Sequence, residues 1–140
     1  MSDSAFLDTN VLVYAFDGAD SRKQQAAAKL VRQLLERGMG VVSTQVLQEF
    51  FVTVTRKVKS PLSVADARSA IEDFAVLRVV GIDVGHILDA IERHQRLKLS
   101  FWDALILTAA ADSGCRTLYT EDLSPGSVLD GVEIVSPFPC

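Results

Sequence analysis

Short apolar runs alternate with longer helical patterns along the chain, and this alternation constrains the fold more than any other feature. The apolar runs predict buried strands at residues 4–7, 40–43, 77–82, 117–120 and 132–135. The patterns between them predict helices at residues 10–16, 21–37, 44–58, 63–74, 84–97 and 101–113. Strands that alternate with helices indicate βαβ units. We predict one α/β domain over residues 1–140, with three layers and a short, mainly parallel sheet flanked by helices.

The composition is that of an ordinary globular domain. Of the 140 residues, 49% are hydrophobic and 23% are charged, unlike a disordered chain. The net charge of −4 argues against a polycation that coats nucleic acid. No apolar run reaches the roughly 18 residues of a membrane span, and residues 1–4 lack the pattern of a signal peptide. We therefore expect a cytoplasmic protein without membrane contact.

Asp8 lies between two apolar runs, in the stretch Phe6-Leu7-Asp8-Thr9-Asn10. An ionised carboxylate in such surroundings is unfavourable unless it accepts hydrogen bonds or binds a cation. Asp8 or Thr9 could also be the N-cap of the helix that follows. The residues around Asp8 do not separate these two interpretations, so the remaining acids must decide.

Three more acids are expected at the same edge of the sheet as Asp8. Glu49 lies in the helix after the second strand, Asp103 begins the most apolar helix, and Asp122 follows the fourth strand. Ligands of open parallel sheets bind outside the carboxyl ends of the strands. The predicted fold therefore gathers these four acids, which come from four separate elements.

Each of these acids also has a plainer interpretation. Glu49 could lie on a solvated helix face, and Asp103 could form a capping box with Ser100. Asp122 could be a turn residue, and Glu121 could replace it or act beside it. Four acids on four elements argue more strongly for a common site than any one of them does.

Clustered carboxylates raise one another's pKa unless cations hold them together. A site made only of oxygen ligands suits Mg²⁺ or Mn²⁺. Such ions bind phosphate oxygens, lower the pKa of a bound water and stabilise charge on the attacking and leaving oxygens. The residues therefore predict metal-dependent attack of water on a phosphate ester, with one or two ions.

Four blocks of the sequence resemble the PIN-domain nucleases, in order and over nearly the whole chain. They are Leu7-Asp8-Thr9-Asn10-Val11-Leu12, Gln48-Glu49-Phe50, Ser100-Phe101-Trp102-Asp103-Ala104-Leu105-Ile106 and Leu118-Tyr119-Thr120-Glu121-Asp122-Leu123. The single small domain is most similar to the VapC-type toxins of bacterial toxin–antitoxin pairs.

This resemblance implies a ribonuclease toxin that cleaves RNA with a metal-activated water and leaves a 5′-phosphate. The implied catalytic residues, which are also the implied ligands of Mg²⁺ or Mn²⁺, are Asp8, Glu49, Asp103 and Asp122. Thr9, Asn10 and Thr120 would assist through hydrogen bonds or waters, and the family pattern favours Asp122 over Glu121. The resemblance also implies a cognate antitoxin that occludes the acidic pocket, and a homodimer.

Two basic clusters flank the predicted site. RNA phosphates could be held by Arg56, Lys57 and Lys59 and by Arg93, Arg96 and Lys98, although solvated helix faces would have the same composition. We expect Trp102 and Phe50-Phe51 to lie in the core and not to stack on bases. The alternatives to a ribonuclease are a non-catalytic binding module, a metal-dependent phosphatase and a DNA nuclease.

Overall fold

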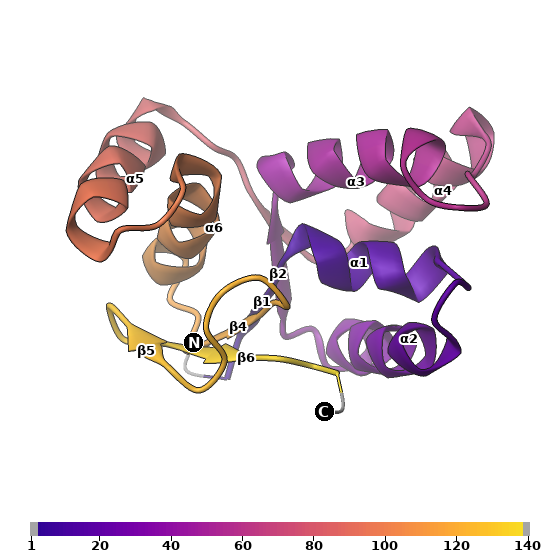
Figure 1. Cartoon of the computed structure of the whole chain (residues 1–140), viewed down its shortest axis with the longest axis horizontal. Helices are drawn as coiled ribbons and strands as arrows, with labels where there is room; N and C mark the ends of the chain where they lie inside the picture. The colour runs from indigo at the N-terminus through magenta and orange to yellow at the C-terminus, as the bar shows by residue number, and fades with distance from the viewer. Residues whose placement is uncertain (1–2, 139–140) are drawn as a thin grey trace.

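Six strands form one sheet in the computed structural model of the chain, which describes residues 3–138 (Figure 1). Residues 1–2 and 139–140 lie outside the described residues, including the start of the segment read for a signal peptide. The strands are β1 (Ala5–Leu7), β2 (Gly40–Ser43), β3 (Arg78–Val80), β4 (Thr117–Tyr119), β5 (Val128–Leu129) and β6 (Val132–Val135).

The sheet has the order β3-β2-β1-β4-β6-β5. Every neighbouring pair is parallel except β5 and β6, which are antiparallel. At the centre of the sheet, Ala5 of β1 pairs with Gly40 of β2 on one side and with Thr117 of β4 on the other. The prediction of a short, mainly parallel sheet is therefore confirmed.

Six helices connect the strands of this sheet. They are α1 (Thr9–Phe16), α2 (Ser21–Arg37), α3 (Thr44–Arg56), α4 (Val64–Phe74), α5 (Val84–Leu97) and α6 (Phe101–Asp112). A short polar side chain caps the start of each one by accepting a backbone N–H of its first turn; these caps are Asp8, Asp20, Ser43, Ser63, Asp83 and Ser100. The polar residue before each apolar pattern therefore sets where the helix begins.

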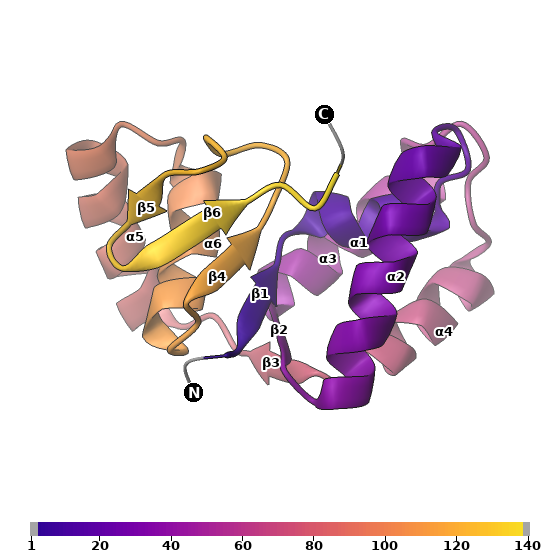
Figure 2. The same ribbon diagram turned by 90° about the horizontal axis from the view of Figure 1, so that it is seen from below.

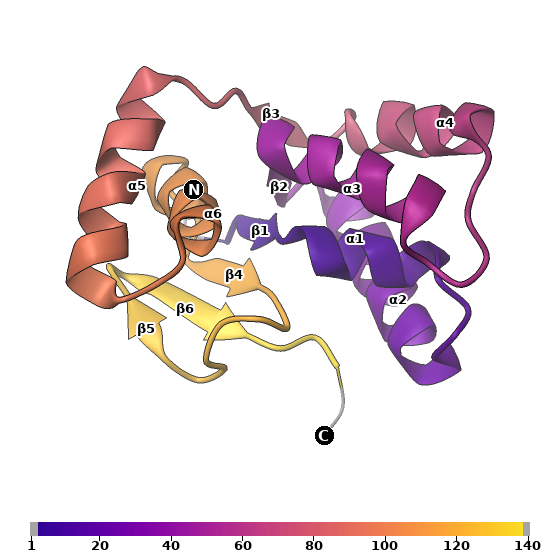
Figure 3. The same ribbon diagram turned by 45° about the horizontal axis from the view of Figure 1, so that its top comes forward.

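The helices cover both faces of the sheet. From β1 the chain moves outward to β2 and β3, and then returns to β4 on the other side of β1. Because parallel crossovers are right-handed, the two directions place their helices on opposite faces. Figure 2 shows α1 and α2 on one side of β1 and α6 on the other, and Figure 3 shows the paired helices α1 with α3 and α5 with α6. The predicted three layers are confirmed.

The core is continuous through the centre of the sheet. All three residues of β1 are buried, and α6 is buried on every side from Ala104 to Ala110. Phe50 is fully buried and packs edge-to-face on Phe74, with the ring centroids 5.1 Å apart. Phe50 is thus in the core as expected, whereas Phe51 is only partly buried.

The structure adds one strand and shortens two elements by more than one residue. β5 was not predicted, because two residues are too few to carry an alternating pattern. The third strand is limited to Arg78–Val80, the residues that pair with β2, and α3 ends at Arg56. Within residues 3–138, no helix has both the length and the apolar character that crossing a bilayer requires.

Candidate active site

Asp8 lies at the point where the strand order of the sheet reverses. It directly follows β1, and its backbone N–H donates to the carbonyl of Tyr119 at the end of β4 (3.0 Å). Thr120, Glu121 and Asp122 follow β4. A crevice at the carboxyl ends of two diverging strands is the usual ligand site of such sheets. The predicted position of the site is therefore also where the fold favours a ligand.

The Asp8 carboxylate is buried and held at both oxygens. It is 5% exposed, Oδ1 accepts the Thr9 N–H (2.7 Å), and Oδ2 accepts the Thr120 hydroxyl (2.7 Å). The first bond is the helix cap that the sequence suggested. Asp8 is thus the cap of α1 and a buried acid at the sheet edge, so the two interpretations are compatible.

Burial raises the pKa of Asp8 to about 7. The hydrogen bonds from Thr120 and Thr9 act in the opposite direction, whereas the negative charges of Asp122 and Glu49 raise the pKa further. The protein's own donors therefore compensate only part of the cost of ionising this carboxylate. A cation at this point would supply the missing compensation.

Glu49, on α3, is linked to Asp8 by Thr9, which donates a hydrogen bond to each carboxylate. The Thr9 hydroxyl donates to Glu49 Oε1 (2.7 Å), while the Thr9 N–H is bonded to Asp8. Gln45 Nε2 donates to Glu49 Oε2 (3.2 Å). Glu49 is therefore half-buried and oriented, and does not lie on a fully solvated helix face.

The structure separates Asp122 from Glu121. Asn10 Nδ2 donates to Asp122 Oδ2 (3.0 Å), and this bond directs Asp122 to the start of α1. Glu121 instead pairs with Lys23 of α2 and accepts the Tyr14 hydroxyl (3.0 Å). Sequence reasoning missed Lys23, because no local pattern links two residues so far apart. Both acids line one hollow, but Asp122 is directed towards the start of α1 and Glu121 towards Lys23.

Asp103 occupies the first turn of α6. Its backbone N–H donates to Ser100 Oγ (3.1 Å), so the expected cap is present. Partial burial raises the pKa of Asp103, a hydrogen bond from Ser100 lowers it, and the charges of Asp122 and Glu49 raise it again. The charges of Asp122 and Glu49 therefore raise the pKa of Asp8 and that of Asp103. We call Asp8, Glu49, Asp103 and Asp122 the acid cluster.

Three adjoining hollows surround the acid cluster. One of about 480 Å³ is lined by Thr9, Glu49 and Trp102, among others. A second of about 350 Å³ shares Thr9 with the first and includes Asp122. A third of about 330 Å³ includes both Asp122 and Asp103. Neighbouring hollows share residues, and together the three are lined by all of the acids except the buried Asp8.

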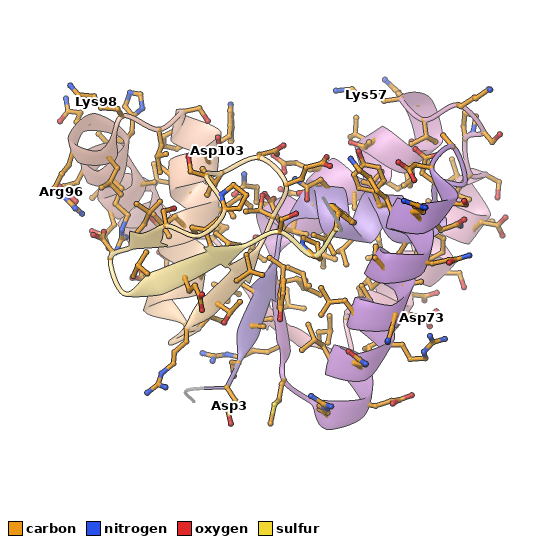
Figure 4. All side chains as sticks on the ribbon, turned by 60° about the horizontal axis from the view of Figure 1, so that its bottom comes forward. Asp3, Lys57, Asp73, Arg96, Lys98 and Asp103 are labelled. Carbon is orange, nitrogen blue, oxygen red and sulfur yellow. The ribbon has the colours of Figure 1, made fainter. Side chains whose placement is uncertain are left out.

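Two lysines line these hollows. Lys57 lines the hollows that contain Glu49 and Asp122, and Lys98 lines the hollow that contains Asp103. Figure 4 shows Asp103 between these two lysines along one edge of the molecule, with Asp3 at the opposite edge. Arg56 and Lys59 are exposed beside Lys57.

Arg93 and Arg96 are engaged elsewhere. Both pair with Asp130 in the β5–β6 turn, at 2.8 Å from Arg93 Nε and 2.7 Å from Arg96 Nη2. Arg93 also donates to the Thr108 hydroxyl (3.0 Å), and Arg96 pairs with Glu92 (2.7 Å). These contacts fasten α5 to α6 and to the edge of the sheet, so the two arginines have a structural role in addition to the predicted RNA contact.

Trp102 is not in the core, and that expectation was wrong. Its side chain is 61% exposed and lines the 480 Å³ hollow beside Glu49. Because α6 is apolar on nearly every face, helical periodicity could not distinguish the exposed Trp102 from the buried residues that follow it. The position directly before Asp103 was the only available signal.

The acid cluster has the donor chemistry that Mg²⁺ or Mn²⁺ requires, because all of its ligand atoms are carboxylate oxygens. Among the residues that the structure describes, no three Asp, Glu, His or Cys side chains are arranged to hold an ion together. Hydroxyl and amide donors hold Asp8, Glu49 and Asp122 in their present positions. The residues fit a divalent cation in type and charge, and binding would draw the carboxylates together.

Comparisons with known proteins identify the family and the fold of the chain. The PIN domain family model matches residues 5–124. No protein of curated function matches the chain in sequence. Among solved structures, the chain is similar to Mycobacterium tuberculosis VapC20, described as a Sarcin-Ricin loop cleaving toxin. The two are 23% identical, with 85% of this chain and 92% of that chain covered and a TM-score of 0.66.

Two further structures are similar over almost the whole length of both chains. A toxin–antitoxin complex from Klebsiella pneumoniae is 22% identical, covers 98% of this chain and 100% of its own, and has a TM-score of 0.69. DNA-bound VapBC from Salmonella typhimurium is 16% identical, covers 96% and 98%, and has the same TM-score of 0.69. The fold is that of the VapC toxins, and with the family model matching most of its length, the chain belongs to the PIN domain family.

Proposed function

We propose that this protein is a metal-dependent endoribonuclease, the toxin of a type II toxin–antitoxin pair. The observation that carries the proposal is the acid cluster itself. The four carboxylates come from four elements. Glu49, Asp103 and Asp122 line adjoining hollows, Asp8 is buried, and the charges of Asp122 and Glu49 raise the pKa of both Asp8 and Asp103. Such mutual repulsion is unfavourable for a purely structural arrangement and favourable for a site that binds cations.

In this proposal Asp8, Glu49, Asp103 and Asp122 hold one or two Mg²⁺ or Mn²⁺ ions. Bound ions of this type lower the pKa of a water and neutralise charge on phosphate oxygens. Thr9 orients Asp8 and Glu49 together, and Thr120 fixes the second oxygen of Asp8. Asn10 orients Asp122, while Glu121 stays with Lys23.

Lys57 and Lys98 hold the RNA backbone on either side of the acid cluster. A negatively charged crevice repels a polyanion, and lysines at its two ends offset that repulsion. Among residues 3–138 neither lysine takes part in an ion pair with an acid, which leaves both available for phosphates. Arg56 and Lys59 extend the basic surface at one end.

The test is RNA cleavage with Mg²⁺ or Mn²⁺ by the wild type, Asp8→Asn and Asp103→Asn. We expect the wild type to cleave, EDTA to stop it, and each variant to lose activity by at least about 100-fold, because each removes a metal ligand. Asp66→Asn, an exposed aspartate in the first turn of α4, is the matched control. Full activity in Asp8→Asn and Asp103→Asn would show that the assigned site is wrong.

The proposal includes a cognate antitoxin that occludes the acid cluster and a cytoplasmic site of action. The similar structures from Klebsiella and Salmonella are complexes of a toxin with its antitoxin, and this motivates the partner. A guanidinium group from that partner suits paired carboxylates, because it donates two parallel hydrogen bonds.

The test of the antitoxin is co-expression. We expect the protein encoded by the neighbouring reading frame to relieve the growth arrest that this chain causes. If that protein binds this chain and growth arrest persists, the proposed antitoxin role is contradicted. Homodimerisation remains a prediction, to be checked by light scattering.

A further inference from the structure

We propose that Trp102 and the 480 Å³ hollow beside it form a nucleobase subsite, in which the base next to the cleaved phosphate of single-stranded RNA stacks on the indole ring. The inference rests on the proposed ribonuclease function. It adds an aromatic stacking group to a hollow that Glu49 of the acid cluster also lines. It also reverses what the sequence suggested for this residue.

The first argument is the exposure of an aromatic ring at the site. Trp102 is 61% exposed although it lies in the first turn of a helix that is otherwise buried. Burial of an indole in water-free contact is strongly favourable, so a ring left open beside an acidic crevice is available for a ligand. Phe101 contacts the Trp102 ring edge-to-face, with centroids 5.1 Å apart, and this contact restricts its orientation.

The second argument is the chemistry of the hollow. Residues with polar side-chain groups surround the indole, with Thr9, Gln48, Thr53 and Lys57 among them. A stacking face, a polar rim and a cation together match the base, its hydrogen-bonding edge and a phosphate. A protein partner would instead require a broad apolar face. Among the described residues Val52 is the one aliphatic side chain that lines this hollow, and the apolar face lies in the neighbouring hollow lined by Leu47, Phe51, Val52 and Ile71.

The third argument is the way Gln45 joins this hollow to the acid cluster. Gln45 Nε2 donates to Glu49 Oε2 (3.2 Å) and to the Trp102 carbonyl (3.3 Å). Both partners are acceptors, so the orientation of the amide is determined by its neighbours. Gln45 is 5% exposed, and its Oε1 is buried without a hydrogen-bond partner among the described residues. Gln45 therefore holds Glu49 and the backbone of Trp102 in a fixed relation to each other, while its own Oε1 is too buried to meet a ligand in the hollow.

The experiment uses the fact that Trp102 is the single tryptophan of the chain. Its fluorescence therefore reports on this hollow alone. A short single-stranded RNA is titrated into the Asp8→Asn protein with Mn²⁺, where the proposed function expects binding without cleavage. We expect saturable quenching by RNA and none by an abasic oligonucleotide of the same length, since stacking requires a base.

Binding of the same RNA to variants supplies the second readout. Trp102→Ala should weaken binding by about 10- to 100-fold, the range that stacking on one aromatic side chain gives. Trp102→Phe should keep most of the affinity, because a phenyl ring still stacks. Leu88→Ala is the matched control, since Leu88 is also 61% exposed but lies on α5 outside the hollows that surround the acid cluster. The affinity for Mn²⁺ should be unchanged in all three.

Equal quenching by RNA and by the abasic oligonucleotide would overturn the inference, and so would wild-type affinity in Trp102→Ala. An emission spectrum that shifts with protein concentration in the absence of RNA would also overturn it, by showing that a second copy of the chain covers Trp102. These outcomes leave metal-dependent cleavage intact. Loss of the proposed function would appear instead as cleavage by Asp8→Asn.

Discussion

Asp8 shows how one residue can be both a structural and a functional group. Its Oδ1 caps α1 through the Thr9 N–H, and its carboxylate is buried beside two other acids. The cap favours the ionised form, whereas burial and the neighbouring charges oppose it. Because burial is the larger effect, the pKa rises, and the metal-free protein is less stable with Asp8 ionised than with Asp8 protonated.

This balance predicts how pH affects the free energy of unfolding of the metal-free protein. The pKa of Asp8 is raised from 3.8 to about 7, so its protonated form stabilises the folded state fully below pH 4. That contribution is lost as the pH rises through 7. In EDTA, Asp8→Asn should therefore match the wild type near pH 4 and exceed it at pH 8 by on the order of 3 kcal/mol. Urea unfolding across this range measures it; a difference independent of pH would contradict the prediction.

Glu121 and Asp122 are adjacent acids with different partners, and this difference predicts different effects. Asp122→Asn removes an acid of the cluster, so activity should fall by at least about 100-fold. Glu121→Gln removes the partly exposed pair with Lys23, so activity should stay within a few fold and stability should fall by less than about 1 kcal/mol. Steady-state cleavage and thermal unfolding of both variants separate the roles. Loss of activity in Glu121→Gln alone would reverse the assignment.

At the scale of elements, Asp130 fastens the β5–β6 turn to α5. Its backbone φ of 49° is left-handed, a conformation that Asp and Asn tolerate better than most residues. The hydrogen bonds from Arg96 and Arg93 hold the pKa of Asp130 down to about 2. The ionised form therefore stabilises the fold above pH 4, and the contribution is lost as the pH falls towards 2.

Asp130→Asn tests this anchor without altering the backbone preference. We expect a loss of about 1–3 kcal/mol at pH 7 in urea unfolding, because two charge-assisted contacts become weaker and Arg93 stays largely buried. Glu92→Gln, which affects only the exposed pair with Arg96, should cost less than about 1 kcal/mol. Equal losses in the two variants would show that the turn is not a structural anchor.

The strength of each local pattern decided which elements could be predicted from sequence. Phe6 and Leu7 are apolar, buried and followed by a polar cap, so β1 and the start of α1 were clear. Val128 and Leu129 form a strand only because β6 lies beside them, and two residues carry no period. Trp102 was misplaced for the opposite reason: α6 is apolar on every face, so its pattern could not single out the exposed residue.

At the scale of the whole molecule, charge is distributed so that a negatively charged protein can still hold RNA. The net charge is −4, but Lys57 and Lys98 line the hollows of the acid cluster and lie on either side of Asp103 (Figure 4). Lys57→Ala and Lys98→Ala should each weaken RNA binding and reduce the dependence of log Kd on log salt by about 0.7. Anisotropy titrations at several salt concentrations measure this slope. Unchanged slopes would place the RNA backbone elsewhere.

The sequence was sufficient to place the acid cluster at one edge of the sheet, because the order of strands and helices determines which ends meet. It could not determine how each carboxylate is held. The Thr9 hydroxyl reaches Glu49 across forty residues, and Asn10 reaches Asp122 across more than a hundred. The first contact depends on the register of β1 against β2 and on the packing of α1 against α3, and the second depends on the register of β1 against β4; only the folded protein defines these.

The central claim is that four acids from four elements act as one metal site, and Mn²⁺ binding to single variants tests it most directly. Asp8→Asn, Glu49→Gln, Asp103→Asn and Asp122→Asn are each titrated with Mn²⁺ by calorimetry, beside Glu121→Gln and Asp66→Asn. We predict that each of the first four weakens binding by at least about tenfold, because each removes a carboxylate ligand. The two controls should bind as the wild type does. Wild-type affinity in any one of the four cluster variants would contradict the claim of a single shared site.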